Sequence, residues 1–146
     1  MKFVTDTVLV DRERENQGRK RIEQSMIIIE QGDSSPYVKI DEIENLMLLR
    51  GNSFSANPKQ LFAEVLEWGR EYKVPGGQRF KIEITVGYYS TSHIQLLNLF
   101  LKTLNSNNPG LIDVVFIVDQ EDEEDLDEVM LSLTFNTGIT HKVSYS

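Results

Sequence analysis

The most restrictive pattern in the sequence is a strict alternation of apolar and polar side chains that runs directly into a helical pattern. Between residues 80 and 88 apolar side chains occupy every second position, which predicts a strand with one buried face. The spacing then changes to three and four residues, which predicts an amphipathic helix with one apolar face, formed by Ile94, Leu97, Phe100, Leu101 and Leu104. A strand and helix of this kind require a sheet against which the helix packs.

The residues before this strand predict a hairpin and a first helix. Residues 36–40 and 46–49 are short apolar runs around a polar turn, which is typical of a β-hairpin. Asn57 and Pro58 predict a helix start, with Asn as the capping residue and Pro at the first helical position. Apolar residues at helical spacing extend this helix to Tyr72, and Trp68 on the same face is expected in the core.

The residues after the second helix complete an α/β pattern. Residues 111–118 are almost continuously apolar, which predicts a strand covered on both faces. A third helix begins within the acidic residues 119–127, and residues 139–145 predict an edge strand. The order β-β-α-β-α-β-α, closed by a last strand, predicts a single mixed β-sheet with helices packed against it. Helical connections favour parallel pairs, whereas the hairpin contributes an antiparallel pair.

The first 25 residues differ from the rest of the chain. They are mostly polar, apart from a short strand predicted at Val8-Leu9-Val10, and we interpret residues 1–25 as a solvated N-terminal extension. Met26 opens a new apolar run, so residues 26–146 are predicted to form one α/β domain.

Composition excludes several classes of function. The chain has no cysteine, which excludes disulfides, thiolate metal sites and a cysteine nucleophile. The net charge of −8 disfavours nucleic acid and anionic membranes as partners and favours proteins. No apolar run approaches the roughly 20 residues of a membrane span, and the N-terminus has no signal-peptide core, so a cytoplasmic location is expected.

No metal or cofactor site is predicted. Residues 119–128 hold eight carboxylates, but Glu124 stands where a calcium-binding EF-hand loop starting at Asp119 requires glycine. His93 and His141 lie far apart and have no companion at metal-ligand spacing. The sequence also has neither a nucleophile elbow nor a phosphate-binding glycine loop.

The hydroxyl residues at the junction between the alternating strand and the second helix are therefore the main candidates for function. Ser90 can cap the helix, which would place Thr91 and Ser92 in the first turn. A phosphate on either residue would meet free backbone N–H groups and the positive end of the helix dipole. From the residues alone, an ordinary helix cap and a phosphorylation switch both remain open.

Three segments resemble a known family. They are the hairpin residues 36–53, the helix from Asn57-Pro58 to Trp68, and the junction Tyr88-Tyr89-Ser90-Thr91-Ser92. Together with the strand and acidic run from Val114 to Asp125, they resemble the SiaC-type biofilm-regulation phosphoproteins over about 110 residues. The switch logic of that family is similar to that of STAS-type proteins, so a STAS-like fold is expected.

The resemblance implies a non-enzymatic signalling protein that is controlled by reversible phosphorylation of Thr91. A protein kinase and a PP2C-type phosphatase would act on Thr91. The unphosphorylated form would bind and activate a diguanylate cyclase, raising cyclic-di-GMP and promoting biofilm formation. The surrounding recognition surface would consist of Tyr88, Tyr89, Ser90, Ser92 and His93.

Two residues depart from the family pattern, and two other functions stay open. Ser90 stands where the family usually has asparagine, and His93 where it usually has a small residue, so Ser90 or Ser92 could compete with Thr91 as the phosphorylated residue. One alternative is a small enzyme that uses His93 and the neighbouring hydroxyls. The other is a scaffold domain in which Ser90 is an ordinary helix cap.

Overall fold

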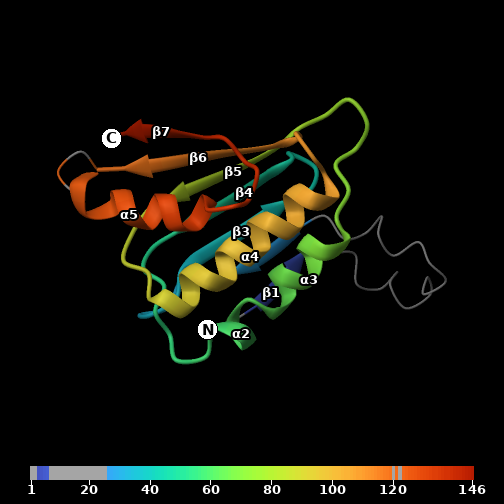
Figure 1. Cartoon of the computed structure of the whole chain (residues 1–146). Coiled ribbons are helices and arrows are strands. Elements are labelled where there is room, and N and C mark those ends of the chain that lie inside the picture. Colours follow the sequence, from blue (N-terminus) through green and yellow to red (C-terminus); the bar gives the residue numbers. More distant parts are fainter. Residues whose placement is uncertain (1–2, 7–25, 120, 122) are drawn as a thin grey trace.

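The fold is a single mixed sheet with helices packed against it (Figure 1). The computed structural model describes residues 3–6, 26–119, 121 and 123–146. The strands are β1 Phe3–Asp6, β2 Met26–Ile29, β3 Tyr37–Asp41, β4 Leu46–Arg50, β5 Phe80–Thr85, β6 Ile112–Val118 and β7 His141–Tyr145. The helices are α2 Pro58–Leu61, α3 Ala63–Glu71, α4 Thr91–Asn107 and α5 Glu123–Thr134.

The strands lie in the sheet in the same order as in the chain, from β1 to β7. Strands β1 to β4 pair antiparallel, and strands β4 to β7 pair parallel through the helical connections. The predicted hairpin, the parallel pairs and the closing edge strand are therefore confirmed. Two strands that were not predicted, β1 and β2, extend the antiparallel half of the sheet.

All the described helices cover the same face of the sheet (Figure 1). Each parallel connection advances by one strand in the same direction, and such connections are right-handed as a rule, so successive helices lie side by side. The prediction that β6 is covered on both faces is therefore wrong. Val114 and Phe116 are buried beneath the helices, whereas Val115 and Ile117 on the other face stay partly exposed.

The N-terminal residues contribute to the sheet more than their polarity suggests. Phe3–Asp6 pairs with Met26–Ile29 as an antiparallel edge strand, so these residues of the predicted extension belong to the sheet. The strand predicted at Val8-Leu9-Val10 lies outside the described residues.

The predicted first helix is divided into α2 and α3. Asn57 caps α2 as predicted, because its side-chain oxygen accepts a hydrogen bond from the Gln60 backbone N–H, and Pro58 occupies the first helical position. Phe62, with φ −99° and ψ 10°, separates the two helices, and its ring is buried in the core. The predicted apolar face is therefore present, but two helices form it instead of one continuous helix.

Trp68 lies in the core, as predicted, beneath α3. Its ring stacks on Tyr72 with ring centroids 4.5 Å apart, and its Nε1–H donates to the Glu42 carboxylate at 2.8 Å. The polar edge of the indole thus has a partner while the ring excludes water. The rings of Phe80 and Phe100, both fully buried, lie next to the Trp68 ring.

We expect Gly69→Ala to destabilise the fold, because this glycine of α3 packs closely against Phe100 of α4. An added Cβ would lie 2.8 Å from Cε1 of Phe100, whose buried ring is held against Trp68. Overpacking of this kind typically costs about 1–3 kcal/mol, which exceeds the ~1 kcal/mol gained from helix propensity. Chemical denaturation should therefore show a lower free energy of unfolding for Gly69→Ala.

Gly76→Ala is the matched control, since an added Cβ there meets nothing within 4 Å. It should change the free energy of unfolding by less than about 0.5 kcal/mol. Equal stabilities of the two variants would contradict this account of the contact between α3 and α4.

Candidate functional site

The junction before α4 is held in place by the loop that follows β4. The predicted strand ends at Thr85, three residues before Tyr88, because the chain there leaves the sheet and pairs with this loop. The Ser53 backbone N–H donates to the Tyr88 carbonyl at 2.8 Å, and the Ser90 N–H donates to the Ser53 carbonyl at 3.0 Å. These two hydrogen bonds set the position at which α4 begins.

Gly87 permits this close approach. An added Cβ at this position would lie 2.7 Å from Oδ1 of Asn52 and 3.3 Å from the Gly51 carbonyl oxygen. The same Oδ1 accepts a hydrogen bond from the Tyr88 N–H at 2.9 Å. A side chain at position 87 would therefore push the loop away from the junction.

His93 links the first turn of α4 to the same loop. Its ring is fully buried, with 0% of its surface exposed, and packs edge-on against Phe62. Nε2–H donates to the Ser55 carbonyl at 3.0 Å, so Nδ1 is the acceptor for the Ser53 hydroxyl. Burial lowers the pKa of His93 below its ordinary value, and the hydrogen bond to the Ser55 carbonyl opposes this shift.

This geometry does not suit catalysis by His93. Both ring nitrogens are occupied by the loop, and no carboxylate of the described residues contacts the ring. The residue was predicted to belong to a recognition surface, yet the structure places its side chain beneath that surface. His93 therefore supports the junction from within the core.

Ser90 occupies the N-cap position of α4 but does not cap the helix as predicted. Its backbone is extended, with φ −73° and ψ 161°, and its carbonyl accepts from the Ile94 N–H at 3.0 Å. Its side chain makes no capping hydrogen bond and instead lies 3.4 Å from the Ser92 hydroxyl. The first-turn N–H groups consequently have no side-chain acceptor at the cap.

Thr91 is the first residue of α4, and both it and Ser92 are exposed. Tyr88 is also exposed, and its ring meets Phe54 edge-on with centroids 5.6 Å apart. Tyr89, by contrast, is buried, and its hydroxyl has no hydrogen-bond partner among the described residues, so burial raises its pKa. Of the predicted recognition residues, Tyr88, Ser90 and Ser92 can reach a partner directly, whereas Tyr89 cannot.

Thr91 also lines a groove of about 540 Å³ between α4 and α5, which we call the α4/α5 groove. The residues that line it are Thr91, Ile94, Gln95, Asn98, Glu128, Leu131, Ser132 and Phe135. Leu131 and Phe135 were not among the site residues expected from the sequence. They are apolar residues four apart that lie off the inward face of the third helix, and this spacing could have identified them.

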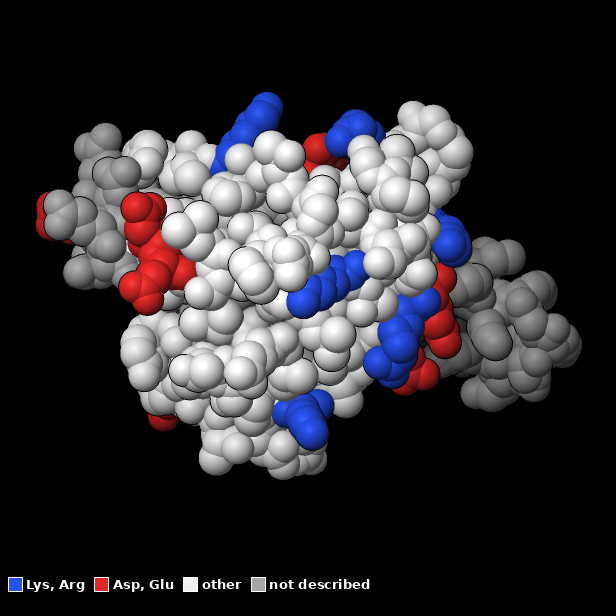
Figure 2. Space-filling view, viewed as in Figure 1, with Lys and Arg blue, Asp and Glu red and all other residues white. Residues whose placement is uncertain are grey.

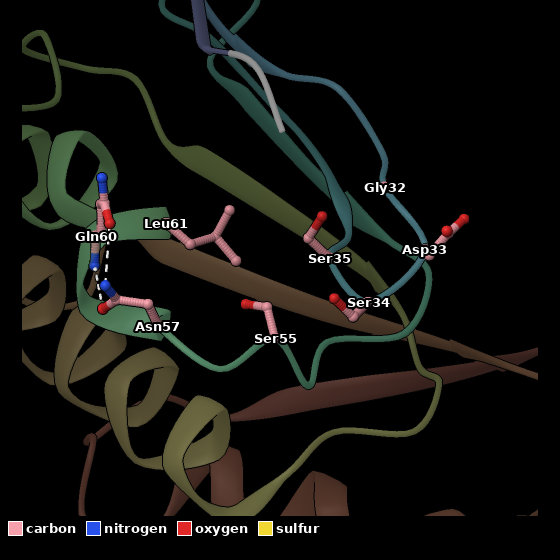
Figure 3. Close-up of a pocket in the computed structure, with 8 residues that line it drawn as sticks. All are labelled: Gly32, Asp33, Ser34, Ser35, Ser55, Asn57, Gln60 and Leu61. Carbon is pink, nitrogen blue, oxygen red and sulfur yellow. Dashed lines mark hydrogen bonds between the residues drawn. The ribbon is translucent and has the colours of Figure 1, made fainter.

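A second hollow, of about 380 Å³, lies between residues 32–35 and residues 55–61 (Figure 3). Ser34, Ser35 and Ser55 contribute hydroxyl groups to its wall, and Asn57 and Gln60 bond each other at its edge. Ser55 connects this hollow to His93 through its carbonyl. Its wall mixes polar and apolar surface, and Asp33 contributes the single carboxylate among the lining residues.

Within the described part of the chain, no three histidine, cysteine, aspartate or glutamate residues lie close enough together to hold a metal ion. None of the helices described there is long and apolar enough to span a membrane.

The chain is a member of a class of regulatory phosphoproteins. Residues 29–138 match the model of the SiaC family of regulatory phosphoproteins, and the chain belongs to that family. It is therefore a regulatory protein rather than an enzyme. The resemblance found in the sequence is confirmed.

Solved structures agree on the fold. The chain aligns with one chain of the crystal structure of the diguanylate cyclase SiaD in complex with its activator SiaC from Pseudomonas aeruginosa, with a TM-score of 0.70 and 17% identity over 82% of this chain and 98% of that one. The apo-SiaC structure from the same organism aligns with a TM-score of 0.64 and 18% identity over 82% and 98%. By sequence, none of the curated proteins matches this chain.

We expect His93 to make the fold less stable in mild acid. The folded-state pKa of His93 lies below its ordinary value of 6.5, so the unfolded chain binds the additional proton. Stability should be fully present above pH 6.5 and should fall as the pH drops below that value. Unfolding free energies measured between about pH 7.5 and about pH 5 should show this loss.

The contribution of His93 is isolated by comparing the His93→Gln variant with the unmodified protein. His93→Gln should flatten the pH dependence in this window. If the free energy of unfolding of His93→Gln depended on pH as steeply as that of the unmodified protein, His93 would not be the source of the pH dependence.

Proposed function

We propose that phosphorylation of Thr91 switches the binding of this protein to its partner proteins. The observation that carries the proposal is the exposed Thr91 hydroxyl at the first position of a 17-residue helix without a side-chain cap. The chain belongs to a family of regulatory phosphoproteins, and a modified residue within it must be accessible to other enzymes. Thr91 meets that requirement without any change of fold.

The local chemistry favours a phosphate on Thr91. The first-turn N–H groups of α4 can donate to phosphate oxygens, and the helix dipole favours negative charge there. The loop contacts of Ser53 and His93 hold this turn rigidly, so the phosphate would act on the surface rather than on the fold. Ser92 is exposed in the same turn and is the nearest competing hydroxyl.

A diguanylate cyclase is the proposed output partner. One structure with the same fold shows SiaC of Pseudomonas aeruginosa as the activator of the diguanylate cyclase SiaD. By analogy, the unphosphorylated form of this protein would bind and activate a cyclase and promote biofilm formation. A protein kinase would add the phosphate and a PP2C-type phosphatase would remove it, both in the cytoplasm.

We expect Thr91→Ala to abolish phosphate incorporation. The protein would be incubated with its cognate kinase and ATP, and the modified residue mapped by mass spectrometry. Ser90→Ala and Ser92→Ala are matched controls that remove neighbouring hydroxyls and should keep most of the incorporation. Persistent phosphorylation of Thr91→Ala would reject the assignment to Thr91.

Substitutions at Thr91 should also show how phosphorylation affects activation of the cyclase. Thr91→Ala should keep activating the cyclase in the presence of the kinase, whereas Thr91→Glu should reduce cyclic-di-GMP synthesis even without it. A scaffold with an ordinary helix start would instead give equal cyclase activity with both variants.

A further inference from the structure

The side of strands β3 to β7 that points away from the helices is here called the open face. All the described helices lie on the other side of the sheet (Figure 1). Strands β4 to β7 pair parallel, and parallel strands are normally covered on both faces. On the open face β4 carries Leu46 and Leu48, and β6 carries Val115 and Ile117, all of them partly exposed. The parallel half of the sheet therefore presents apolar side chains that no described element covers.

One row of side chains crosses the open face and shows its pattern. The strand register places Lys39, Leu48, Glu83, Val115 and Lys142 side by side on β3 to β7. Neighbouring strands lie about 4.8 Å apart, so the apolar columns of β4 and β6 are separated by about 10 Å and the two lysines by about 19 Å. The first distance matches the width of an α-helix, about 10 Å. Two apolar columns thus lie between two lines of positive charge.

The open face is positively charged, although the chain has a net charge of −8. Every Lys, Arg, Asp and Glu of strands β3 to β7 points to this face: Lys39, Arg50, Lys81 and Lys142 against Asp41, Glu83 and Asp113. Acidic side chains gather instead on the helix-bearing side, beside α5 at the left of Figure 2. The two sides of the sheet therefore differ in the sign of their charge.

The carboxylates of the open face already have partners. Glu83 pairs with Lys81 at 3.2 Å, and Asp113 pairs with Arg79 at 2.7 Å. Asp41 accepts two backbone N–H groups of the following turn at 3.0 Å. The lysines at the two ends of the row form no salt bridge with any described residue. Their charges are consequently available to a partner.

We propose that the open face binds an acidic amphipathic helix of a partner protein, with its apolar stripe on the columns of β4 and β6 and its carboxylates opposite Lys39 and Lys142. A helix on this face would complete the three-layer arrangement in which parallel strands are normally found. The acidic flanks follow from charge complementarity with the two lysines. Glu83, beneath the helix, already has a lysine partner, so covering it leaves no unpaired charge.

Two other occupants of the open face fit its charge less well. Residues 1–25 contain six basic and five acidic residues, so they do not supply two acidic flanks. A second copy of the chain packed face to face would bring the lysines of both copies together. The proposed surface also lies on the opposite side of the sheet from α4, so its use does not depend on the proposed switch at Thr91.

Photo-crosslinking with the full-length chain in its own cells can identify the occupant. A p-benzoylphenylalanine would replace Leu48, and the same group in place of Leu99, 49% exposed on α4, serves as the control. Crosslinks specific to position 48 should come from an amphipathic helical segment with acidic residues on both sides of its apolar stripe. Crosslinks to residues 1–25, to a second copy or to a segment without acidic residues would overturn the proposal, as would the absence of any crosslink specific to position 48.

The crosslinked segment is then synthesised as a peptide and titrated against the purified protein. The double variant Lys39→Glu/Lys142→Glu should bind it about tenfold more weakly or worse, because attraction is replaced by repulsion. Lys59→Glu/Lys102→Glu makes the same change of charge on α2 and α4 and should bind normally, since salt screens distant charges. Circular dichroism would verify that both variants fold. Equal affinities of the two double variants would overturn the proposal.

Phosphorylation provides a test that separates the two proposals. The peptide should bind the phosphorylated and unphosphorylated protein equally, because Thr91 lies on the helix-bearing side. Loss of peptide binding on phosphorylation would contradict the placement of the helix on the open face. If the peptide binds as described but Thr91→Ala is still phosphorylated, the switch proposal fails alone. If Thr91 controls the cyclase but the lysine variants bind normally, the open-face proposal fails alone.

Discussion

The feature on which the rest of the structure depends is the stepwise parallel pairing from β4 to β7. Because each helical connection advances one strand in the same direction, α3, α4 and α5 lie on one face of the sheet. The same pairing brings α4 and α5 side by side with their starts at the same edge. Thr91 and Glu128 of α5 line the same groove for this reason, although they are far apart in the sequence.

A second constraint acts inside the junction. His93, Ser53 and Ser55 form a buried set of hydrogen bonds that joins the first turn of α4 to the loop after β4. Buried polar groups of this kind are costly when unpaired, so the set favours one arrangement of the loop. The exposed hydroxyls of Thr91 and Ser92 thus lie on a rigid base, which suits a residue that other proteins must recognise in a defined position.

Much of the fold could be predicted because the spacing of apolar residues within one strand or helix depends only on that element. The alternation from Phe80 to Thr85 and the spacing along α4 each reflect a single element and its buried face. The strand β6 was misjudged for a physical reason. Val115 and Ile117 are apolar but face the uncovered side of the sheet, and hydropathy alone does not reveal which faces the helices cover.

The sequence by itself determined the order of most elements and the place of three hydroxyls at a helix start, because periodicity and capping chemistry act between near neighbours. Only the tertiary structure decided that Tyr89 and His93 are buried and that Ser90 leaves the helix uncapped. It also decided that Leu131 and Phe135 border the groove that contains Thr91. These outcomes depend on contacts between segments about 40 residues apart, which are set by the pairing of strands and the packing of helices rather than by local spacing.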